Sequence, residues 1–218
     1  MTDPTIPSLP TAETAVLMID MQNGFLHEEG WTARMSGSVS ASLAATIEPA
    51  ARTLAAAREA GVPVIHTQHG WEPGYADGGF IADEIYPRLF AQMPEQGRFD
   101  MVKGSWDVDF LDALAPLPGE HVVPKNRYDA FIGTGLERLL MRLKVRTLVV
   151  GGVVTTVCVE STVRDAAMRD FRVFLVGDAI GDADQAAHDE GLSRLGRMFG
   201  HLVSSDDVAA AWAPALVA

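Results

Sequence analysis

Residues 147–170 read TLVVGGVVTTVCVESTVRDAAMRD, and this stretch decides the fold of the chain. Its first part, residues 147–154, is apolar and rich in valine, which is typical of a strand buried inside a parallel sheet. Its second part has apolar residues at helical spacing, with Glu160 four residues before Arg164 as a helix-surface pair. The sequence therefore predicts a strand that turns sharply into a helix. Cys158, the only cysteine, lies in that turn or in the first turn of the helix.

The position of Cys158 admits two interpretations. Free backbone N–H groups at a helix N-terminus favour a thiolate, lower the pKa of a cysteine and can also hold an oxyanion. A lone cysteine can equally be a small buried hydrophobic residue. The position alone leaves both interpretations open, so the rest of the chain has to decide between them.

Composition excludes several classes of protein. The chain has 218 residues, of which 48% are hydrophobic and 21% charged, and this suits one folded domain. A net charge of −12 makes the chain a poor partner for nucleic acid or an anionic membrane. A single cysteine rules out an internal disulfide framework and fits a reducing cytoplasm. With no apolar run near the roughly 20 residues of a membrane span and no signal-peptide layout, we expect a cytoplasmic protein with an N-terminal arm (1–13) and one domain (14–218).

Strand and helix patterns alternate along the chain. We expect strands over residues 15–21, 62–67, 121–123, 147–154, 171–176 and 201–203. We expect helices over residues 38–60, 106–114, 135–144, 182–199 and 208–216, besides the helix that follows Cys158, and loops over 22–37 and 68–104. A loop as long as the second is usually functional or carries short helices. The alternation predicts an α/β fold, with a six-stranded, mostly parallel sheet covered by helices on both faces in a Rossmann-like, three-layer arrangement.

Three chemically active side chains lie at or after the ends of predicted strands. Asp20 lies near the C-terminal end of the first strand, Lys125 follows the third strand and Cys158 follows the fourth. Ligands bind such sheets beyond the carboxyl ends of the strands, so an acid, an amine and a thiol meet there if the first and fourth strands are neighbours. A nucleophilic cysteine needs a base. Only His66 and His69 among the histidines lie near a suitable strand end, but Asp20 could take the thiol proton while Lys125 favours the thiolate.

Together these segments resemble the signature segments of the isochorismatase-like cysteine hydrolases. They read AVLMIDMQNGF around Asp20, VVPKNRYDAF around Lys125 and GGVVTTVCVESTVRDA around Cys158. The resemblance implies a triad in which Cys158 is the nucleophile, Asp20 the general base and Lys125 the electrostatic partner. It also implies a cis peptide bond between Val153 and Val154, an oxyanion hole formed by the N–H groups of Val154 and Cys158, and a homo-oligomer, commonly a dimer or tetramer. It implies no cofactor.

Members of this family divide by substrate. Those that cleave isochorismate lack the cysteine, so Cys158 argues for attack on an amide or ureide carbonyl. Nicotinamidases carry an Asp/His metal cluster after the second strand, and the spacing around His66 and His69 does not reproduce it, so we expect no metal site. The closer likeness is to ureidoacrylate amidohydrolases and the related biuret and N-carbamoylsarcosine hydrolases. It is carried by residues 68–79, 102–116, 124–131 and 157–166. Thr156 and His69 depart from the residues common in these relatives.

We therefore expect a cysteine-dependent amidohydrolase that cleaves a small amide or ureido C–N bond through a thioester and releases ammonia or carbamate. A ureidoacrylate-like substrate is favoured. The alternatives are an isochorismatase-type vinyl-ether hydrolase, a nicotinamidase-like amidase and a non-catalytic scaffold. The candidates for the substrate pocket, each with packing or a solvated loop as the alternative, are Phe25, His69, Trp71, Asp77, Tyr128 and Phe131. Arg127 is a candidate for a substrate carboxylate or for a subunit interface.

Overall fold

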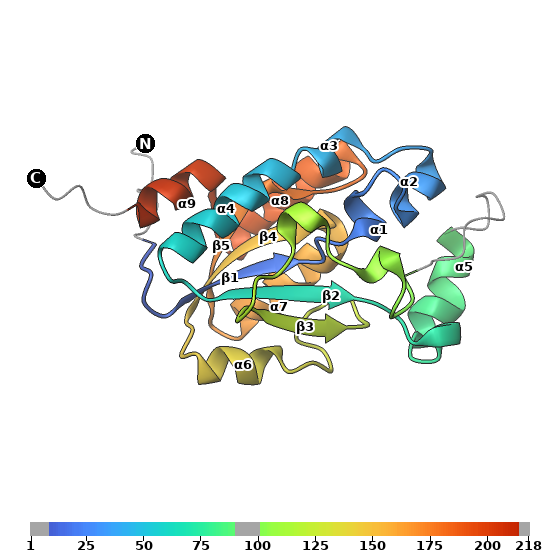
Figure 1. The fold of residues 1–218 in the computed structure, drawn as a ribbon, viewed down its shortest axis with the longest axis horizontal. Helices are drawn as coiled ribbons and strands as arrows, with labels where there is room; N and C mark the ends of the chain where they lie inside the picture. Colours follow the sequence, from blue (N-terminus) through green and yellow to red (C-terminus); the bar gives the residue numbers. More distant parts are fainter. Residues whose placement is uncertain (1–8, 90–100, 214–218) are drawn as a thin grey trace, which may run out of the picture.

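A six-stranded sheet runs through the middle of the molecule (Figure 1). The computed structural model describes residues 9–89 and 101–213. In spatial order the strands are β3 (His121–Lys125), β2 (Val64–His69), β1 (Thr14–Ile19), β4 (Thr147–Val153), β5 (Arg172–Gly181) and β6 (His201–Val203). Every neighbouring pair is parallel. The predicted α/β fold is confirmed, and the strand order reverses between β1 and β4, where ligands bind in sheets of this kind.

The central strands β1 and β4 are buried along their whole length. Their apolar sequences suit strands that are covered by helices on both faces. The register pairs Ile19 with Gly152, whose φ is 131°. A Cβ atom on Gly152 would lie 2.2 Å from the carbonyl oxygen of Ile19, so only glycine allows this approach. The close contact holds together the carboxyl ends of the two strands, which Asp20 and Val154 follow directly.

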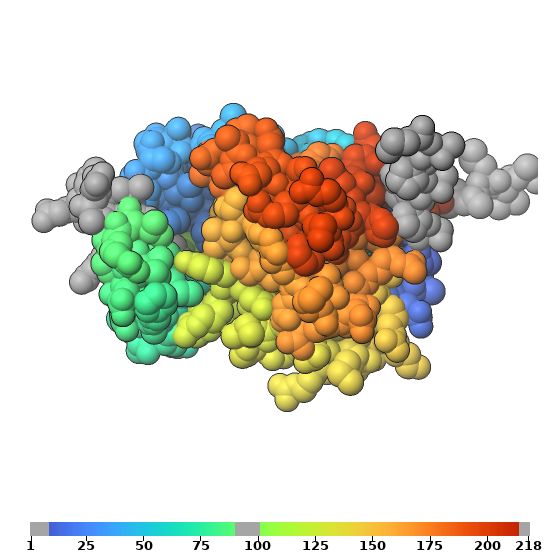
Figure 2. All heavy atoms as spheres, turned by 180° about the vertical axis from the view of Figure 1, so that it is seen from behind, coloured from blue at the N-terminus to red at the C-terminus, as the bar shows by residue number. Residues whose placement is uncertain are grey.

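Helices cover both faces of the sheet (Figure 1), and the view from behind shows the orange residues of the C-terminal half on the rear of the molecule (Figure 2). On one face lie α3 (Ala41–Ala44), α4 (Ile47–Glu59) and α9 (Ser205–Trp212), and on the other lie α6 (Leu136–Arg142), α7 (Glu160–Met168) and α8 (Gln185–Met198). The side chains of Val16 and Val64 join the first layer of helices in one apolar cluster. Those of Leu17 and Ile65 join the second layer. The alternation of side chains along each strand thus divides the core into two halves.

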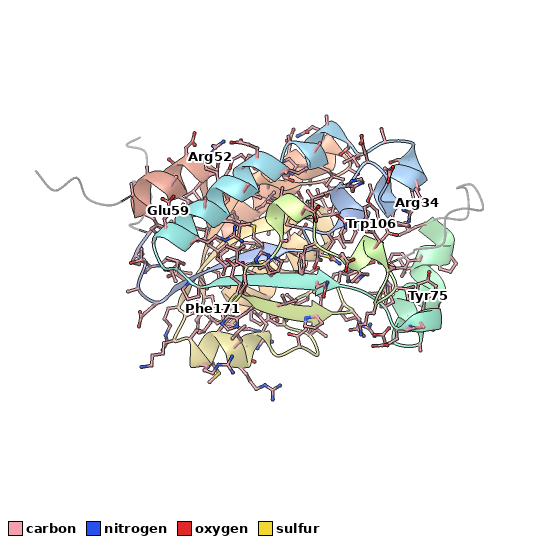
Figure 3. All side chains as sticks on the ribbon, in the orientation of Figure 1. Arg34, Arg52, Glu59, Tyr75, Trp106 and Phe171 are labelled. Atoms are coloured by element: carbon pink, nitrogen blue, oxygen red, sulfur yellow. The ribbon has the colours of Figure 1, made fainter. Side chains whose placement is uncertain are left out.

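Short helices and turns gather at the carboxyl end of the sheet. They are α1 (Asn23–Leu26), α2 (Trp31–Ser36), η1 (Pro73–Tyr75), η2 (Ile81–Ile85), α5 (Tyr86–Leu89) and η3 (Trp106–Val108). Figure 1 shows α1, α2 and α5 beyond the arrowheads of the strands, and Figure 3 labels Tyr75 and Trp106 at the same end. The prediction of a plain loop over residues 22–37 was wrong, because this segment carries two helices. The segment 68–104 carries short helices as predicted, although its residues 90–100 lie outside the described part.

The fifth strand is longer than predicted. Its register shifts opposite β4, and this bulge lets residues 180 and 181 pair with the end of β4 instead of ending the strand at Val176. Asp178 does not end the strand but holds α9: its carboxylate accepts hydrogen bonds from the N–H (2.8 Å) and hydroxyl (2.6 Å) of Ser205. With this anchor and a capping box on Ser204, α9 begins three residues before the predicted start at 208.

Two predicted helices are divided in the structure. The helix expected over 106–114 is two 3-10 turns, η3 and η4 (Asp112–Leu114), because residues 109–111 instead pair with the chain that leaves β1. The helix expected over 38–60 is α3 followed by α4, and Gly61 with a φ of 67° follows the end of α4. In the ranges 9–89 and 101–213, no helix combines the length and the apolar character needed to cross a membrane. Residues 1–8 of the predicted arm lie outside the described part, so the division into arm and domain stays a prediction.

Candidate active site

Lys125 joins Asp20 and Cys158 at the carboxyl edge of the sheet. Its Nζ atom lies 2.6 Å from Oδ2 of Asp20 and 3.3 Å from Sγ of Cys158. The side chains of Lys125 and Asp20 are fully buried, and Cys158 is 6% exposed. The structure therefore brings the three predicted catalytic residues into one cluster.

Each member of this cluster comes from a different element. Asp20 leaves β1 with a φ of 54°, in the left-handed region that few non-glycine residues adopt. Cys158 lies in η5 (Thr155–Val159), a single π-turn between β4 and α7. Lys125 ends β3, which is separated from β1 by β2, so its side chain must cross the end of β2 to reach Asp20. A long cationic side chain is needed at this position.

The ammonium group of Lys125 is held by four neighbours. Besides Asp20 and Cys158, it donates to the carbonyl oxygens of Arg127 (3.0 Å) and Tyr128 (3.2 Å). Burial opposes the charged form, but Asp20 and Cys158 raise the pKa of Lys125 above its ordinary value. Lys125 is therefore a fixed positive charge at physiological pH.

The surroundings of Cys158 favour the neutral thiol. Burial raises the pKa of Cys158 to about 12; Lys125 partly opposes this rise and Asp20 reinforces it. Desolvation therefore outweighs the nearby positive charge of Lys125, and the pKa of Cys158 is raised, in contrast to the lowering that a helix N-terminus favours. Nζ of Lys125 lies close to both the Asp20 carboxylate and the thiol, which places the predicted acceptor of the thiol proton near Cys158.

The peptide bond between Val153 and Val154 is cis, as the resemblance implied. The Val154 carbonyl accepts hydrogen bonds from the N–H groups of residues 157 and 159, at 3.1 and 3.2 Å. The N–H and hydroxyl of Thr156 both donate to the Asp182 carboxylate, at 2.9 and 2.7 Å. These bonds fix the turn that carries Cys158. The oxyanion hole formed by the N–H groups of Val154 and Cys158 stays a prediction.

Four rings form a row at the same end of the sheet. Three of them belong to predicted pocket residues, and the fourth belongs to Tyr86. Ring centroids are 6.4 Å apart for Phe25 and His69, 5.1 Å for His69 and Trp71, and 6.2 Å for Trp71 and Tyr86. The hydroxyl of Tyr86 is hydrogen-bonded to that of Tyr128. The structure thus joins four of the candidates, Phe25, His69, Trp71 and Tyr128, through Tyr86.

Sequence reasoning missed Tyr86. Burial, the hydroxyl of Tyr128 and the charges of Cys158 and Asp20 all raise the pKa of Tyr86, which places its ring near the reacting groups. Its only signal in the sequence was its position among the aromatic residues of the long segment 68–104.

His69 is held neutral beside this charged cluster. Burial lowers the pKa of His69 well below its ordinary value, and the positive charges of Lys125 and Arg127 lower it further. Its backbone is fixed by Gln22, whose side chain accepts from the His69 N–H (2.8 Å) and donates to the His69 carbonyl (2.9 Å). The Gln22 amide also donates to the Val108 carbonyl at 2.7 Å. Gln22 is a second residue that the sequence did not single out.

Asp77 ties two loops together. Its half-buried carboxylate accepts hydrogen bonds from the Glu72 N–H and from the Asn126 amide, both at 2.8 Å. Arg127 Nη1 donates to the carbonyls of Asp77 (2.9 Å) and Asn126 (2.8 Å). These contacts fix the chain after Lys125. A direct contact between Asp77 and a substrate stays a prediction.

Phe131 does not join the ring row. It stacks on Phe171 with a centroid distance of 6.0 Å and belongs to the apolar cluster beneath the sheet, together with the leucines of α6. These contacts are those of a packing residue, which is the alternative stated for Phe131.

His66 and His69 have different surroundings. His66 Nε2 lies 3.0 Å from Oε2 of Glu120, and its ring contacts Phe110 edge-on at 5.5 Å, whereas His69 packs between aromatic rings. Across the described ranges, no three side chains of His, Cys, Asp or Glu are grouped in a way that could hold a metal ion.

Residues 14–207 match the model of the isochorismatase domain. The chain belongs to the isochorismatase family. This isochorismatase-family protein is similar to the ureidoacrylate amidohydrolase RutB of Methylorubrum extorquens, with 38% identity over 202 residues that cover 90% of this chain and 80% of that protein. It is also similar to RutB of Rhizobium rhizogenes, with 39% identity over 178 residues that cover 79% of this chain and 72% of that protein.

Solved structures of the family share the fold. A cysteine hydrolase from Pseudomonas syringae superposes with a TM-score of 0.83 at 28% identity, covering 97% of this chain and 98% of that chain. The N-carbamoylsarcosine amidase of Thermoplasma acidophilum superposes with a TM-score of 0.67 at 26% identity, covering 88% of this chain and 96% of that chain.

Proposed function

We propose that this isochorismatase-family protein is a cysteine-dependent amidohydrolase that cleaves a small amide or ureido C–N bond, with a ureidoacrylate-like substrate. The observation that carries the proposal is the buried cluster in which Lys125 Nζ lies 2.6 Å from Asp20 and 3.3 Å from Cys158. The names of the similar proteins, ureidoacrylate amidohydrolase and N-carbamoylsarcosine amidase, support an amide bond as the target.

In the first step, Asp20 takes the proton of the Cys158 thiol while the sulfur attacks the carbonyl carbon. A C–S bond forms, and the electron pair of the C=O double bond moves to the oxygen. The N–H groups of Val154 and Cys158 hold this oxyanion. Lys125 stays charged throughout and stabilises the sulfur and the carboxylate in turn.

In the second step, the C–N bond breaks and Asp20 gives the thiol's former proton to the leaving nitrogen. This leaves a thioester on Cys158. Water then attacks the thioester carbonyl, Asp20 accepts a proton from that water, and the sulfur leaves and recovers the proton. The reaction consumes one water and returns the enzyme to its starting state.

The rings beside the cluster suit a small planar substrate. Neutral His69 and the hydroxyls of Tyr86 and Tyr128 can exchange hydrogen bonds with a ureide, while Trp71 supplies an apolar wall. The guanidinium carbon of Arg127 lies 5.9 Å from the centroid of the Trp71 ring, and Arg127 forms no ion pair with any described residue. An unpaired cation here favours a substrate with a carboxylate, as ureidoacrylate has.

The test is ammonia release from ureidoacrylate, biuret, N-carbamoylsarcosine, nicotinamide and maleamate by wild type, Cys158→Ala and Asp20→Asn. We expect release from a ureido acid, reduced at least about a thousandfold in both variants. Val163→Ala is the matched control, because Val163 is buried on α7 outside the cluster, and it should retain activity. Wild-type turnover in Cys158→Ala, or no release from any compound, would overturn the proposal. Cleavage of a chorismate-type ether instead would identify the vinyl-ether alternative.

A further inference from the structure

Thr67 forms two hydrogen bonds with Asp20. The Thr67 hydroxyl donates to Oδ1 of Asp20 at 2.6 Å, and Oγ1 of Thr67 accepts a hydrogen bond from the backbone N–H of Asp20 at 3.1 Å. Thr67 lies near the end of β2, paired with Ile19 of β1, and is fully buried. The Thr67 hydroxyl therefore links the backbone N–H of Asp20 to the carboxylate of the same residue, and the two hydrogen bonds form a closed ring.

This ring fixes the direction of the carboxylate. With Oδ1 held by Thr67, Oδ2 is the oxygen that lies 2.6 Å from Lys125. A β-branched side chain such as threonine has few χ1 rotamers, so the hydroxyl itself is rigidly placed. Asp20 needs such support because its φ of 54° is uncommon for a residue with a Cβ atom.

We propose that Thr67 is a positioning residue for the proton transfer between Cys158 and Asp20. This inference rests on the proposed function and extends it to a residue outside the triad. The hydroxyl acts through Asp20: it keeps the carboxylate aimed at the thiol and stabilises its charged form with a short, charge-assisted hydrogen bond.

The bond has a consequence for pH dependence. In the proposed mechanism Asp20 has to be charged to take the thiol proton. Because the Thr67 hydroxyl donates to this carboxylate, its loss should move the acidic limb of activity to higher pH. Other titratable groups around Asp20 and Cys158 are Lys125 from β3, Tyr86 from α5 and Tyr128 from the chain after β3.

The experiment compares Thr67→Val, which removes the hydroxyl at nearly constant shape, with Thr67→Ser, which keeps it. Thr53→Val is the matched control, because Thr53 is equally buried but donates to the Pro49 carbonyl at 2.9 Å within α4. For each variant, kcat and KM on the ureido acid are measured as a function of pH, together with the melting temperature.

We expect Thr67→Val to lower kcat by about ten- to a hundredfold with little change in KM, and to move the acidic limb of kcat/KM up by about one to two pH units. Thr67→Ser should restore the position of the limb, and Thr53→Val should leave both kcat and the limb unchanged. An acidic limb that stays in place in Thr67→Val, or that moves equally in Thr53→Val, would overturn the proposal.

A second readout separates this inference from the proposed function. If wild type hydrolyses none of the compounds, the proposed function fails, and the rate of Cys158 alkylation by iodoacetamide is then followed against pH. That rate also depends on removal of the thiol proton of Cys158, and it needs no substrate. Its acidic limb should move up in Thr67→Val and stay in place in Thr67→Ser. Identical profiles for wild type and both variants would refute the role of Thr67.

Discussion

Replacing Lys125 with methionine tests whether the cation holds the cluster together. Methionine keeps a long unbranched chain but removes the group that lies 2.6 Å from Asp20 and 3.3 Å from Cys158. It also removes the donor to two backbone carbonyls. Leaving one partner of a buried ion pair alone costs about 3–5 kcal/mol. For a chain of this size we therefore expect the melting temperature to fall by roughly 10 °C.

The assay is urea and thermal unfolding of Lys125→Met, Asp20→Asn and the double variant. In the double variant no lone buried carboxylate remains, so its loss of stability should be smaller than the sum of the single losses by about 1–3 kcal/mol. Lys144→Met is the matched control, because Lys144 is exposed and forms no ion pair with a described residue, and its effect should stay within about 0.5 kcal/mol. A loss below about 1 kcal/mol in Lys125→Met, or strict additivity in the double variant, would refute the reasoning.

Three further predictions concern other parts of the fold. Hydrogen bonds from Arg58 and other donors lower the pKa of Glu120 to about 2, although burial favours the neutral form of Glu120. The charged Glu120 side chain therefore stabilises the fold above the ordinary pKa of a glutamate, and this stabilisation is lost as pH falls toward 2. The difference in unfolding free energy between wild type and Glu120→Gln should therefore shrink between about pH 5 and 2. Burial and a neighbouring aspartate raise the pKa of Asp129 to about 6, so the charged form of Asp129 costs stability as pH rises through that value. Asp129→Asn should therefore stabilise the protein at about pH 8 but not at about pH 4, measured in the same urea titrations. Gly152→Ala should prevent soluble expression, because its Cβ would lie 2.2 Å from a backbone oxygen, whereas Gly37→Ala, with open space around it, should cost only about 1–2 kcal/mol by thermal melting.

The fold and the three central side chains could be predicted from the sequence because each depends on local patterns. Buried parallel strands have apolar sequences that can be recognised directly, and Asp20, Lys125 and Cys158 each follow such an apolar run. Because parallel strands end at one edge, their side chains had to be near one another once β1 and β4 were adjacent. The family resemblance supplied the roles of these residues, which the patterns alone left open.

What the sequence did not predict depends on contacts between distant segments. Thr67, Gln22 and Tyr86 matter because of what they touch, and none stands in a motif. The length of β5 depends on a bulge against β4, and the broken helix over 106–114 depends on pairing with the chain after β1. The raised pKa of Cys158 has the same origin, since burial is a property of the assembled fold. The expected homo-oligomer stays a prediction.

The most direct test of the central claim is the mass of the intact protein, quenched in acid at successive times during turnover of a ureido acid. The account predicts a transient covalent adduct that peptide mapping places on Cys158 and that disappears as product accumulates. The mass of the adduct, a carbamoyl group or a larger acyl group, identifies which C–N bond breaks first. An enzyme that turns over while Cys158 stays unmodified at every quench time would contradict the account.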